Sequence, residues 1–305
     1  MPLSPIAASL LTTMPPLEMD NLEESRRLFR QGSENLSELM PAPKVRMESI
    51  SVPTRFGLRA ARRYIPPGPA YPHPIVYYPG GGFVLGGPDT HHALTARLCH
   101  TLGAIVVSVD YAKAPEAKFP QAVYECYDVG IWVSHQASAW NVAQEIVVAG
   151  DSAGGNLAAV VAQLARDANA PPILAQVLYY PVTDMSQETL SRREFSEGYF
   201  LTEAAIQWFG TQYLNDVGDA VNLLASPLLN PNLANLPPTL ILTGEYDPLR
   251  DEGESYADRL AKAGVTVRKV RYDGMIHGFM SIPLFPELQA GIAETKTFLG
   301  AVHSV

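Results

Sequence analysis

Short apolar runs alternate with longer amphipathic runs along most of this chain. The short runs are rich in β-branched residues and bounded by Gly, Pro or polar residues, which is typical of buried strands. They predict strands over residues 44–52, 57–65, 75–78, 104–109, 146–149, 173–179, 239–243 and 265–272. The longer runs have the apolar spacing of helices and predict them over residues 90–102, 120–138, 156–166, 250–263 and 286–299.

This alternation predicts an α/β fold. Strands separated by helices form parallel βαβ units, and their crossovers place helices on both faces of the sheet. Residues 44–52 and 57–65 are expected to form an opening antiparallel pair, with Gly57 in the turn between them. We therefore expect about eight strands in one mostly parallel sheet.

Two stretches depart from the alternation. Residues 17–40 predict a charged amphipathic helix. Residues 185–215 lie between two predicted strands and are rich in aromatic side chains, including Phe200, Trp208 and Phe209. A helical insertion at the carboxyl-terminal edge of the sheet would lie over the loops that follow the strands.

Composition narrows the class of protein. A chain of 305 residues with 47% hydrophobic residues can bury one large core. A net charge of −9 argues against nucleic acid and anionic membrane surfaces as partners. The two cysteines, Cys99 and Cys126, are expected to be buried free thiols, because neither belongs to a C-x-x-C motif. The N-terminus lacks a basic stretch and no apolar run is long enough to span a bilayer, so we expect a cytoplasmic protein.

The segment Gly-Asp-Ser-Ala-Gly-Gly at residues 150–155 carries the strongest chemical signal. It follows the strand predicted at 146–149 and opens the helix predicted over 156–166. A G-x-S-x-G motif in that context is a nucleophile elbow, a turn so sharp that side chains two residues either side of the serine would collide. The motif alone arises by chance, but its strand-turn-helix context makes Ser152 a candidate nucleophile.

One histidine is well placed to act as a base. His277 lies in the segment Asp273–Phe279, with glycines on both sides, just past the strand predicted at 265–272. Catalytic groups of α/β sheets lie at this edge. Three other histidines fall in the predicted helix 90–102 and the rest in a proline-rich loop, a helix end and the C-terminal tail, where structural or solvated roles are simpler explanations.

The candidate acid follows the strand predicted at 239–243. Asp247 lies in the loop after this strand, immediately before a proline. Asp251 and Glu252 fall in the first turn of the next helix, where acidic residues stabilise the helix dipole and need no catalytic role. Asp247 is therefore the predicted acid, with Asp251 as the alternative. The resulting chain order of Ser, Asp and His is that of α/β-hydrolases.

A run of glycines supplies the fourth element. Gly80, Gly81 and Gly82 follow Pro79, directly after the strand predicted at 75–78. Consecutive glycines allow backbone N–H groups to turn toward a developing oxyanion.

Together these motifs resemble the hormone-sensitive-lipase-like carboxylesterases, bacterial family IV of the α/β-hydrolase superfamily. Asp110–Glu116 with Phe119-Pro120 is close to the family's D-Y-R-L-A-P-E…F-P, and Tyr180–Asp184 is a further match. The likeness spans nearly the whole chain. It implies a serine carboxylesterase in which Ser152, Asp247 and His277 form a catalytic triad. It also implies an oxyanion hole made by the N–H groups of Gly81, Gly82 and Ala153.

The resemblance implies a domain plan and a substrate class. Residues 1–43 and 185–215 would form a helical cap, and residues 44–184 and 216–305 the two parts of an α/β-hydrolase core. The implied substrates are small esters of short to medium acyl chains, hydrolysed without a metal or cofactor.

Aromatic residues of the second cap segment are candidates for the substrate pocket, because such sites are mostly apolar concavities. We select Phe200, Trp208 and Phe209, although for any one aromatic a place in the core of the cap is the simpler explanation. A homodimer is compatible with the sequence, which does not determine the oligomeric state.

The chain departs from the family pattern at two positions. Pro79 stands where the family's H-G-G-G loop has its histidine, and Lys113 replaces an arginine in the D-Y-x-x-A-P-E stretch. The oxyanion donors are backbone amides, so Pro79 does not delete the hole. It removes any hydrogen bond by which a histidine side chain would brace the loop.

Two other functions are compatible with the same motifs. The gibberellin receptor resembles this family and binds a small molecule without the catalytic histidine, so a non-catalytic binder is one alternative. A hydrolase of amides, lactones or acetylated sugars is the other, because pocket shape decides the substrate. The presence of both Asp247 and His277 favours an enzyme.

Overall fold

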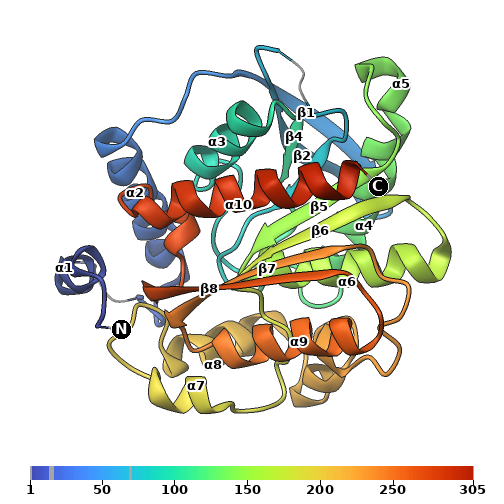
Figure 1. The fold of residues 1–305 in the computed structure, drawn as a ribbon. Coiled ribbons are helices and arrows are strands. Elements are labelled where there is room, and N and C mark those ends of the chain that lie inside the picture. Colours follow the sequence, from blue (N-terminus) through green and yellow to red (C-terminus); the bar gives the residue numbers. More distant parts are fainter. Residues whose placement is uncertain (1, 14–16, 69–70, 305) are drawn as a thin grey trace.

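A single eight-stranded sheet lies at the centre of the molecule (Figure 1). The computed structural model describes residues 2–13, 17–68 and 71–304, and all statements below concern these residues. The strands are β1 (Arg46–Thr54), β2 (Gly57–Ile65), β3 (Ile75–Tyr78), β4 (Val106–Val109), β5 (Ile146–Asp151), β6 (Ile173–Tyr179), β7 (Thr239–Tyr246) and β8 (Val267–Ile276). Their order is β1-β2-β4-β3-β5-β6-β7-β8. The pairs β1/β2 and β2/β4 are antiparallel and the others parallel, so the predicted α/β architecture is confirmed.

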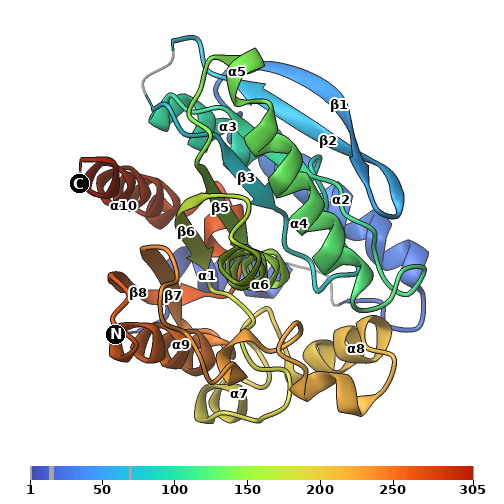
Figure 2. The same ribbon diagram turned by 90° about the vertical axis from the view of Figure 1, so that its right-hand side faces the viewer.

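Helices cover both faces of the sheet. They are α1 (Pro5–Thr13), α2 (Leu22–Leu39), α3 (His92–Leu102), α4 (Gln121–His135), α5 (Ala137–Trp140), α6 (Ala153–Ala168), α7 (Leu190–Glu194), α8 (Glu203–Tyr213), α9 (Arg250–Lys262) and α10 (Pro286–His303). Figure 2 shows α3 and α10 on one side of the sheet and α4 and α6 on the other.

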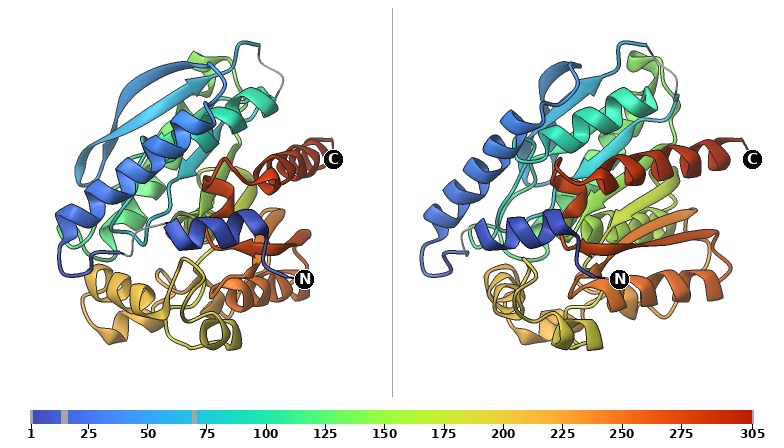
Figure 3. Two further views of the ribbon diagram at one scale, coloured as in Figure 1. Left: turned by 90° about the vertical axis from the view of Figure 1, so that its left-hand side faces the viewer. Right: turned by 60° about the vertical axis from the view of Figure 1, so that its left-hand side comes forward.

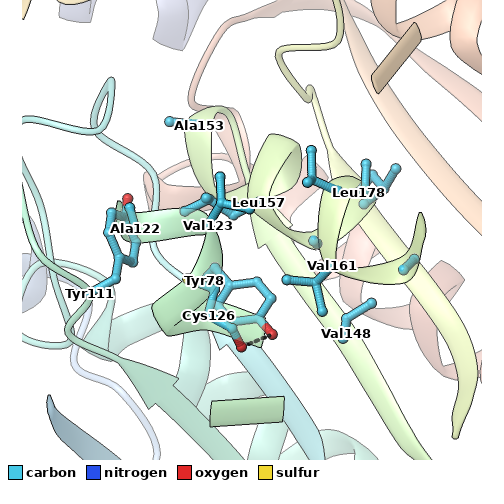
Figure 4. Close-up of a cluster of buried hydrophobic side chains, with 14 of the residues drawn as sticks. Tyr78, Tyr111, Ala122, Val123, Cys126, Val148, Ala153, Leu157, Val161 and Leu178 are labelled. Carbon is cyan, nitrogen blue, oxygen red and sulfur yellow. Dashed lines mark hydrogen bonds between the residues drawn. The ribbon is translucent and has the colours of Figure 1, made fainter. Parts of the chain in front are cut away.

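The sheet has an apolar core on each face because side chains alternate along every strand. On β3, Val76 and Tyr78 belong to the core shared with α4, α6 and α9, whereas Ile75 and Tyr77 belong to the core shared with α3 and α10. Figure 4 shows the first of these cores, where the Tyr78 hydroxyl donates a hydrogen bond to the Cys126 carbonyl at 3.1 Å. Central strands buried on both faces explain why the sequence shows continuous apolar runs there.

The sequence located the main elements but missed some of their bounds. Helix α1 was not predicted, because prolines interrupt the N-terminal segment; Pro5 is the first helical residue, a position where its missing N–H costs nothing. The helix predicted over 120–138 is divided into α4 and α5. Strand β8 continues to Ile276, where it pairs with Tyr246 beyond an irregularity in the ladder.

The N-terminal helices lie on the outside of the core. In Figure 3, α1 lies between α2 and the segment that carries α7 and α8. Helix α2 begins after Asn21, whose side chain accepts a hydrogen bond from the Glu24 N–H and caps the helix. Arg26 on α2 pairs with Glu116 at 2.7 Å and donates to the carbonyls of Val84 and Ala114, which ties α2 to the loop after the glycines. None of the helices in the described ranges is long and apolar enough to span a membrane.

Candidate active site

Ser152 lies on the sharp turn between β5 and α6. Its backbone has φ 54° and ψ −121°, a conformation that non-glycine residues rarely adopt and that requires support from the surrounding packing. A Cβ on Gly154 would lie 1.8 Å from the Tyr78 carbonyl oxygen, and a Cβ on Gly150 2.3 Å from that of Gly154. Both glycines are therefore required by close backbone contact, as the elbow motif predicted.

The structure brings Ser152, His277 and Asp247 together. His277 follows β8 directly, and its Nε2 lies 2.9 Å from the Ser152 Oγ. Its Nδ1 lies 2.8 Å from Oδ2 of Asp247, which follows β7. Asp247 is fully buried and His277 is 5% exposed, so water competes little for these contacts. Three residues that are far apart in the sequence thus form one hydrogen-bonded chain with the geometry of a nucleophile, a base and an orienting acid.

The alternative acid has another partner. The Asp251 carboxylate accepts hydrogen bonds from the Ser191 N–H at 2.8 Å and from Nε of Arg250 at 2.8 Å. It therefore connects the start of α9 to α7. The imidazole of His277 contacts Asp247 and not Asp251, which is the arrangement that the sequence favoured.

The glycine loop after β3 presents backbone donors. Gly81 and Gly82 have φ values of 120° and 61°, which favour glycine. Within the described part of the chain, the N–H groups of Gly81, Gly82 and Ala153 have no hydrogen-bond acceptor. Ala153 is the first residue of α6, where N–H groups lack an intrahelical acceptor and attract negative charge. These donors are available to an oxyanion at Ser152, and their role as the oxyanion hole stays a prediction.

A buried carboxylate connects the elbow to this loop. Asp151 precedes Ser152, is 4% exposed, and accepts hydrogen bonds from Tyr77, Gly80 and His91. Although burial opposes ionisation, His91 and the other donors hold the pKa of Asp151 below its usual value. Sequence reasoning assigned His91 a structural role and gave Asp151 none. The sequence did contain a signal for this contact, because Asp151 and His91 are polar residues that stand among apolar and small ones.

Two of the three predicted pocket aromatics border the site. A Cβ on Gly82 would lie 2.2 Å from the Phe209 ring, and one on Gly278 would lie 3.1 Å from the Phe200 ring. Phe200 is 37% exposed and has a positive φ of 75°. Trp208 packs edge-to-face on Phe209, with 5.1 Å between the ring centroids, and against the core around α4 and α6. Their contact with substrate stays a prediction.

Glu252 is a buried acid near the Asp247 loop. Its Oε1 accepts hydrogen bonds from the N–H groups of Thr183 at 2.7 Å and Asp184 at 3.2 Å. Burial outweighs these bonds and raises the pKa of Glu252 to about 8. The folded protein therefore holds this side chain in its protonated form at neutral pH.

We expect Glu252→Gln to flatten the dependence of stability on pH. A raised pKa in the folded state gives a contribution that is complete below the ordinary value of 4.5 and is lost as the pH rises through about 8. Glutamine keeps an acceptor for both N–H groups but has no proton to lose. As the pH is raised from 5 to 9, the melting temperature should fall less for this variant than for the wild type. The exposed Glu197→Gln serves as control; equal curves for all three proteins would contradict the prediction.

A sequence profile described as the alpha/beta hydrolase fold matches residues 75–281. The chain belongs to the α/β-hydrolases. The resemblance to the hormone-sensitive-lipase-like branch is confirmed by its relatives and structural neighbours.

Several proteins similar to this chain are named esterases. This α/β-hydrolase is 40% identical to the carboxylic ester hydrolase LipN of Mycobacterium tuberculosis, over 93% of this chain and 77% of that one. It is 37% identical to the carboxylesterase NlhH of the same organism, over 98% and 97% of the two chains. The solved structure of a hyperthermophilic esterase from the archaeon Pyrobaculum calidifontis superposes with a TM-score of 0.95 and 42% identity over the whole of both chains. The prediction of a carboxylic ester hydrolase is thereby confirmed at the level of enzyme class.

Proposed function

We propose that this α/β-hydrolase is a serine carboxylesterase that cleaves esters of short to medium acyl chains through an acyl-enzyme on Ser152. The observation that carries the proposal is the chain of contacts from Ser152 Oγ to His277 Nε2 at 2.9 Å and from His277 Nδ1 to Asp247 Oδ2 at 2.8 Å. This arrangement activates a serine that is otherwise a weak nucleophile at neutral pH.

In the acylation half, the Ser152 Oγ attacks the ester carbonyl carbon while His277 Nε2 accepts the hydroxyl proton. The Asp247 carboxylate accepts a hydrogen bond from Nδ1–H, which fixes the tautomer and stabilises the imidazolium. The negative charge that develops on the carbonyl oxygen is stabilised by the N–H groups of Gly81, Gly82 and Ala153. Each such donor is worth about 3 kcal/mol in comparable sites.

The tetrahedral intermediate then collapses. The bond to the alcohol oxygen breaks, and His277 gives its proton to the departing alcohol. Water attacks the acyl-Ser152 ester with His277 again acting as base, and the same N–H groups hold the second oxyanion. The bond between the acyl carbon and the Ser152 Oγ then breaks, and His277 returns the proton to that oxygen. The products are a carboxylic acid and an alcohol.

A substrate panel with an active-site label tests this proposal. We expect p-nitrophenyl esters of about four to eight acyl carbons to be the best substrates, because the resemblance to the hormone-sensitive-lipase-like carboxylesterases implies short to medium acyl chains. A fluorophosphonate should label Ser152 and abolish activity. No labelling would favour the non-catalytic binder. Labelling with turnover only of an amide, a lactone or an acetylated sugar would favour the other alternative.

The cap is part of the proposal, with residues 1–43 and 185–215 as its two segments. Ser4 N–H donates to the Gly274 carbonyl at 3.0 Å, three residues before His277, and Ala7 is fully buried. The start of α1 is thus fixed to the end of β8, which leads directly into His277. We also propose that the partner of this protein is a small-molecule ester and that the protein is cytoplasmic. The free, buried Cys99 and Cys126 support that location, because thiols stay reduced in the cytoplasm. A homodimer is compatible with the proposal.

We expect removal of residues 1–40 to lower activity and promote aggregation. The deletion exposes apolar side chains that α1 and α2 now cover. kcat/KM and light scattering of the truncated and full-length proteins measure both effects. Unchanged activity and solubility would show that these helices are not part of the cap.

A further inference from the structure

The glycine loop needs an anchor that the sequence does not reveal. Gly80, Gly81 and Gly82 restrict the backbone little, and Pro79 has no side-chain donor or N–H to fix the loop. A hydrogen-bond donor that moves by about 1 Å can cost a hundredfold in rate. Some other group must therefore hold the loop against the elbow.

The Asp151 carboxylate accepts hydrogen bonds from four segments of the chain near the site. Its Oδ1 accepts hydrogen bonds from the Tyr77 hydroxyl at 2.6 Å and from the Gly80 N–H at 3.0 Å. Its Oδ2 accepts from His91 Nε2 at 3.1 Å and from the Ser281 hydroxyl at 3.3 Å. These donors come from the end of β3, the glycine loop, the start of α3 and the turn after His277.

The Asp151 carboxylate and its partners are buried and closely packed. Tyr77 is fully buried, His91 is 2% exposed and Asp151 is 4% exposed. A Cβ on Gly80 would lie 2.5 Å from the Asp151 Oδ2, so only glycine allows the loop to approach so closely. From the other side, the Tyr111 hydroxyl donates to the Pro79 carbonyl at 2.6 Å.

We propose that Asp151 is a positioning residue that fixes the oxyanion loop to the nucleophile elbow, through the hydrogen bond from the Gly80 N–H to its Oδ1. Tyr77 and His91 hold the carboxylate in place, and His91 donates from Nε2 because a carboxylate only accepts. The bracing that Pro79 cannot supply thus comes from the residue next to the nucleophile. The inference rests on the proposed esterase mechanism.

A positioning role has a kinetic signature. Acylation and deacylation both pass through an oxyanion held by the same N–H groups, so a displaced loop slows both steps by similar factors. In an acyl-enzyme mechanism, KM then changes little while kcat falls. A purely structural role would lower the melting temperature without this separation.

Three variants test the inference on the full-length protein. Asp151→Ala removes the acceptor, and kcat for a p-nitrophenyl butyrate should fall about a hundredfold with KM within about threefold. Asp151→Asn keeps an oxygen for Tyr77 and Gly80, and its NH₂ can donate to His91 Nε2 once the imidazole carries its hydrogen on Nδ1, next to the Thr90 hydroxyl, so kcat should stay within about tenfold of the wild type. A trifluoromethyl ketone, whose adduct places an oxyanion in the hole, should bind Asp151→Ala more weakly in proportion to the loss of kcat.

Two adjacent tyrosines give a matched pair in case Asp151→Ala does not fold. Tyr77→Phe removes a donor to Asp151, whereas Tyr78→Phe removes a buried hydrogen bond to Cys126 on the opposite face of β3 (Figure 4). Both should lower stability, but only Tyr77→Phe should lower kcat, by about three- to tenfold.

Equal kcat for the two tyrosine variants, or a folded Asp151→Ala variant with kcat within threefold of the wild type, would overturn the inference. Those results leave the esterase proposal intact, because wild-type turnover and labelling of Ser152 test it separately. A wild-type protein inactive toward every ester would overturn both.

Discussion

Replacing Ser152 with alanine is expected to lower kcat for a butyrate ester by about four to six orders of magnitude. The variant lacks the oxygen that forms the acyl-enzyme, so only the oxyanion donors and substrate binding remain to accelerate direct attack by water. Ser152 is half-buried, and the change removes one hydroxyl and leaves His277 Nε2 without that partner, so we expect the fold to persist.

Steady-state kinetics, with thermal unfolding as a check on the fold, measure this effect. Ser134→Ala is the matched control, because it removes a serine hydroxyl that donates to the Gln144 carbonyl away from the site. It should keep wild-type kcat. A Ser152→Ala variant that retains more than about a hundredth of the activity would exclude a covalent mechanism at this residue.

Asp247→Asn is expected to lower kcat by about four orders of magnitude while the fold persists. The Asp247 carboxylate accepts from His277 Nδ1 and, at Oδ1, from the Leu249 N–H at 2.8 Å. An amide presents an NH₂ group to one of these donors and favours the wrong imidazole tautomer. His277 then directs a hydrogen rather than a lone pair at Ser152, so it cannot accept the hydroxyl proton.

Asp251→Asn serves as its control, because this nearby acid in the first turn of α9 binds Ser191 and Arg250 instead. The kcat of this variant should fall by less than about tenfold. The protein should also lose a little stability, because the contact between α9 and α7 is weakened. If Asp251→Asn proved the more damaging change, the assignment of the acid would be wrong. Parallel measurement of kcat and melting temperature for both variants decides the question.

Local sequence predicted those parts of the site that depend on backbone constraint. Gly150, Ser152 and Gly154 form a turn whose geometry is dictated within five residues, so the elbow can be recognised from the motif and its flanking strand and helix. Asp247 and His277 each follow a strand. In a parallel sheet those strand ends share one edge, which explains why candidates distant in sequence meet in space.

Helix α1 and the ends of several elements were beyond local prediction. Prolines around α1 argue against a helix in isolation, and only packing of Ala7 and its neighbours against the core around α10 makes it stable. Strand β8 extends to Ile276 because β7 provides a pairing partner beyond the ladder irregularity. Propensity is a weak guide where tertiary contacts supply the stabilising energy.

By itself, then, the sequence determined the α/β architecture, the family and the candidates Ser152, Asp247 and His277, because periodicity and motif spacing are local properties. The tertiary structure alone decided which groups share the buried space around them. It paired His277 with Asp247 rather than Asp251, and it placed Phe209 over Gly82. It also brought Asp151 together with Tyr77, Gly80 and His91. A hydrogen bond depends on distances of about 3 Å between atoms, and for residues distant in sequence only the packed fold sets such distances.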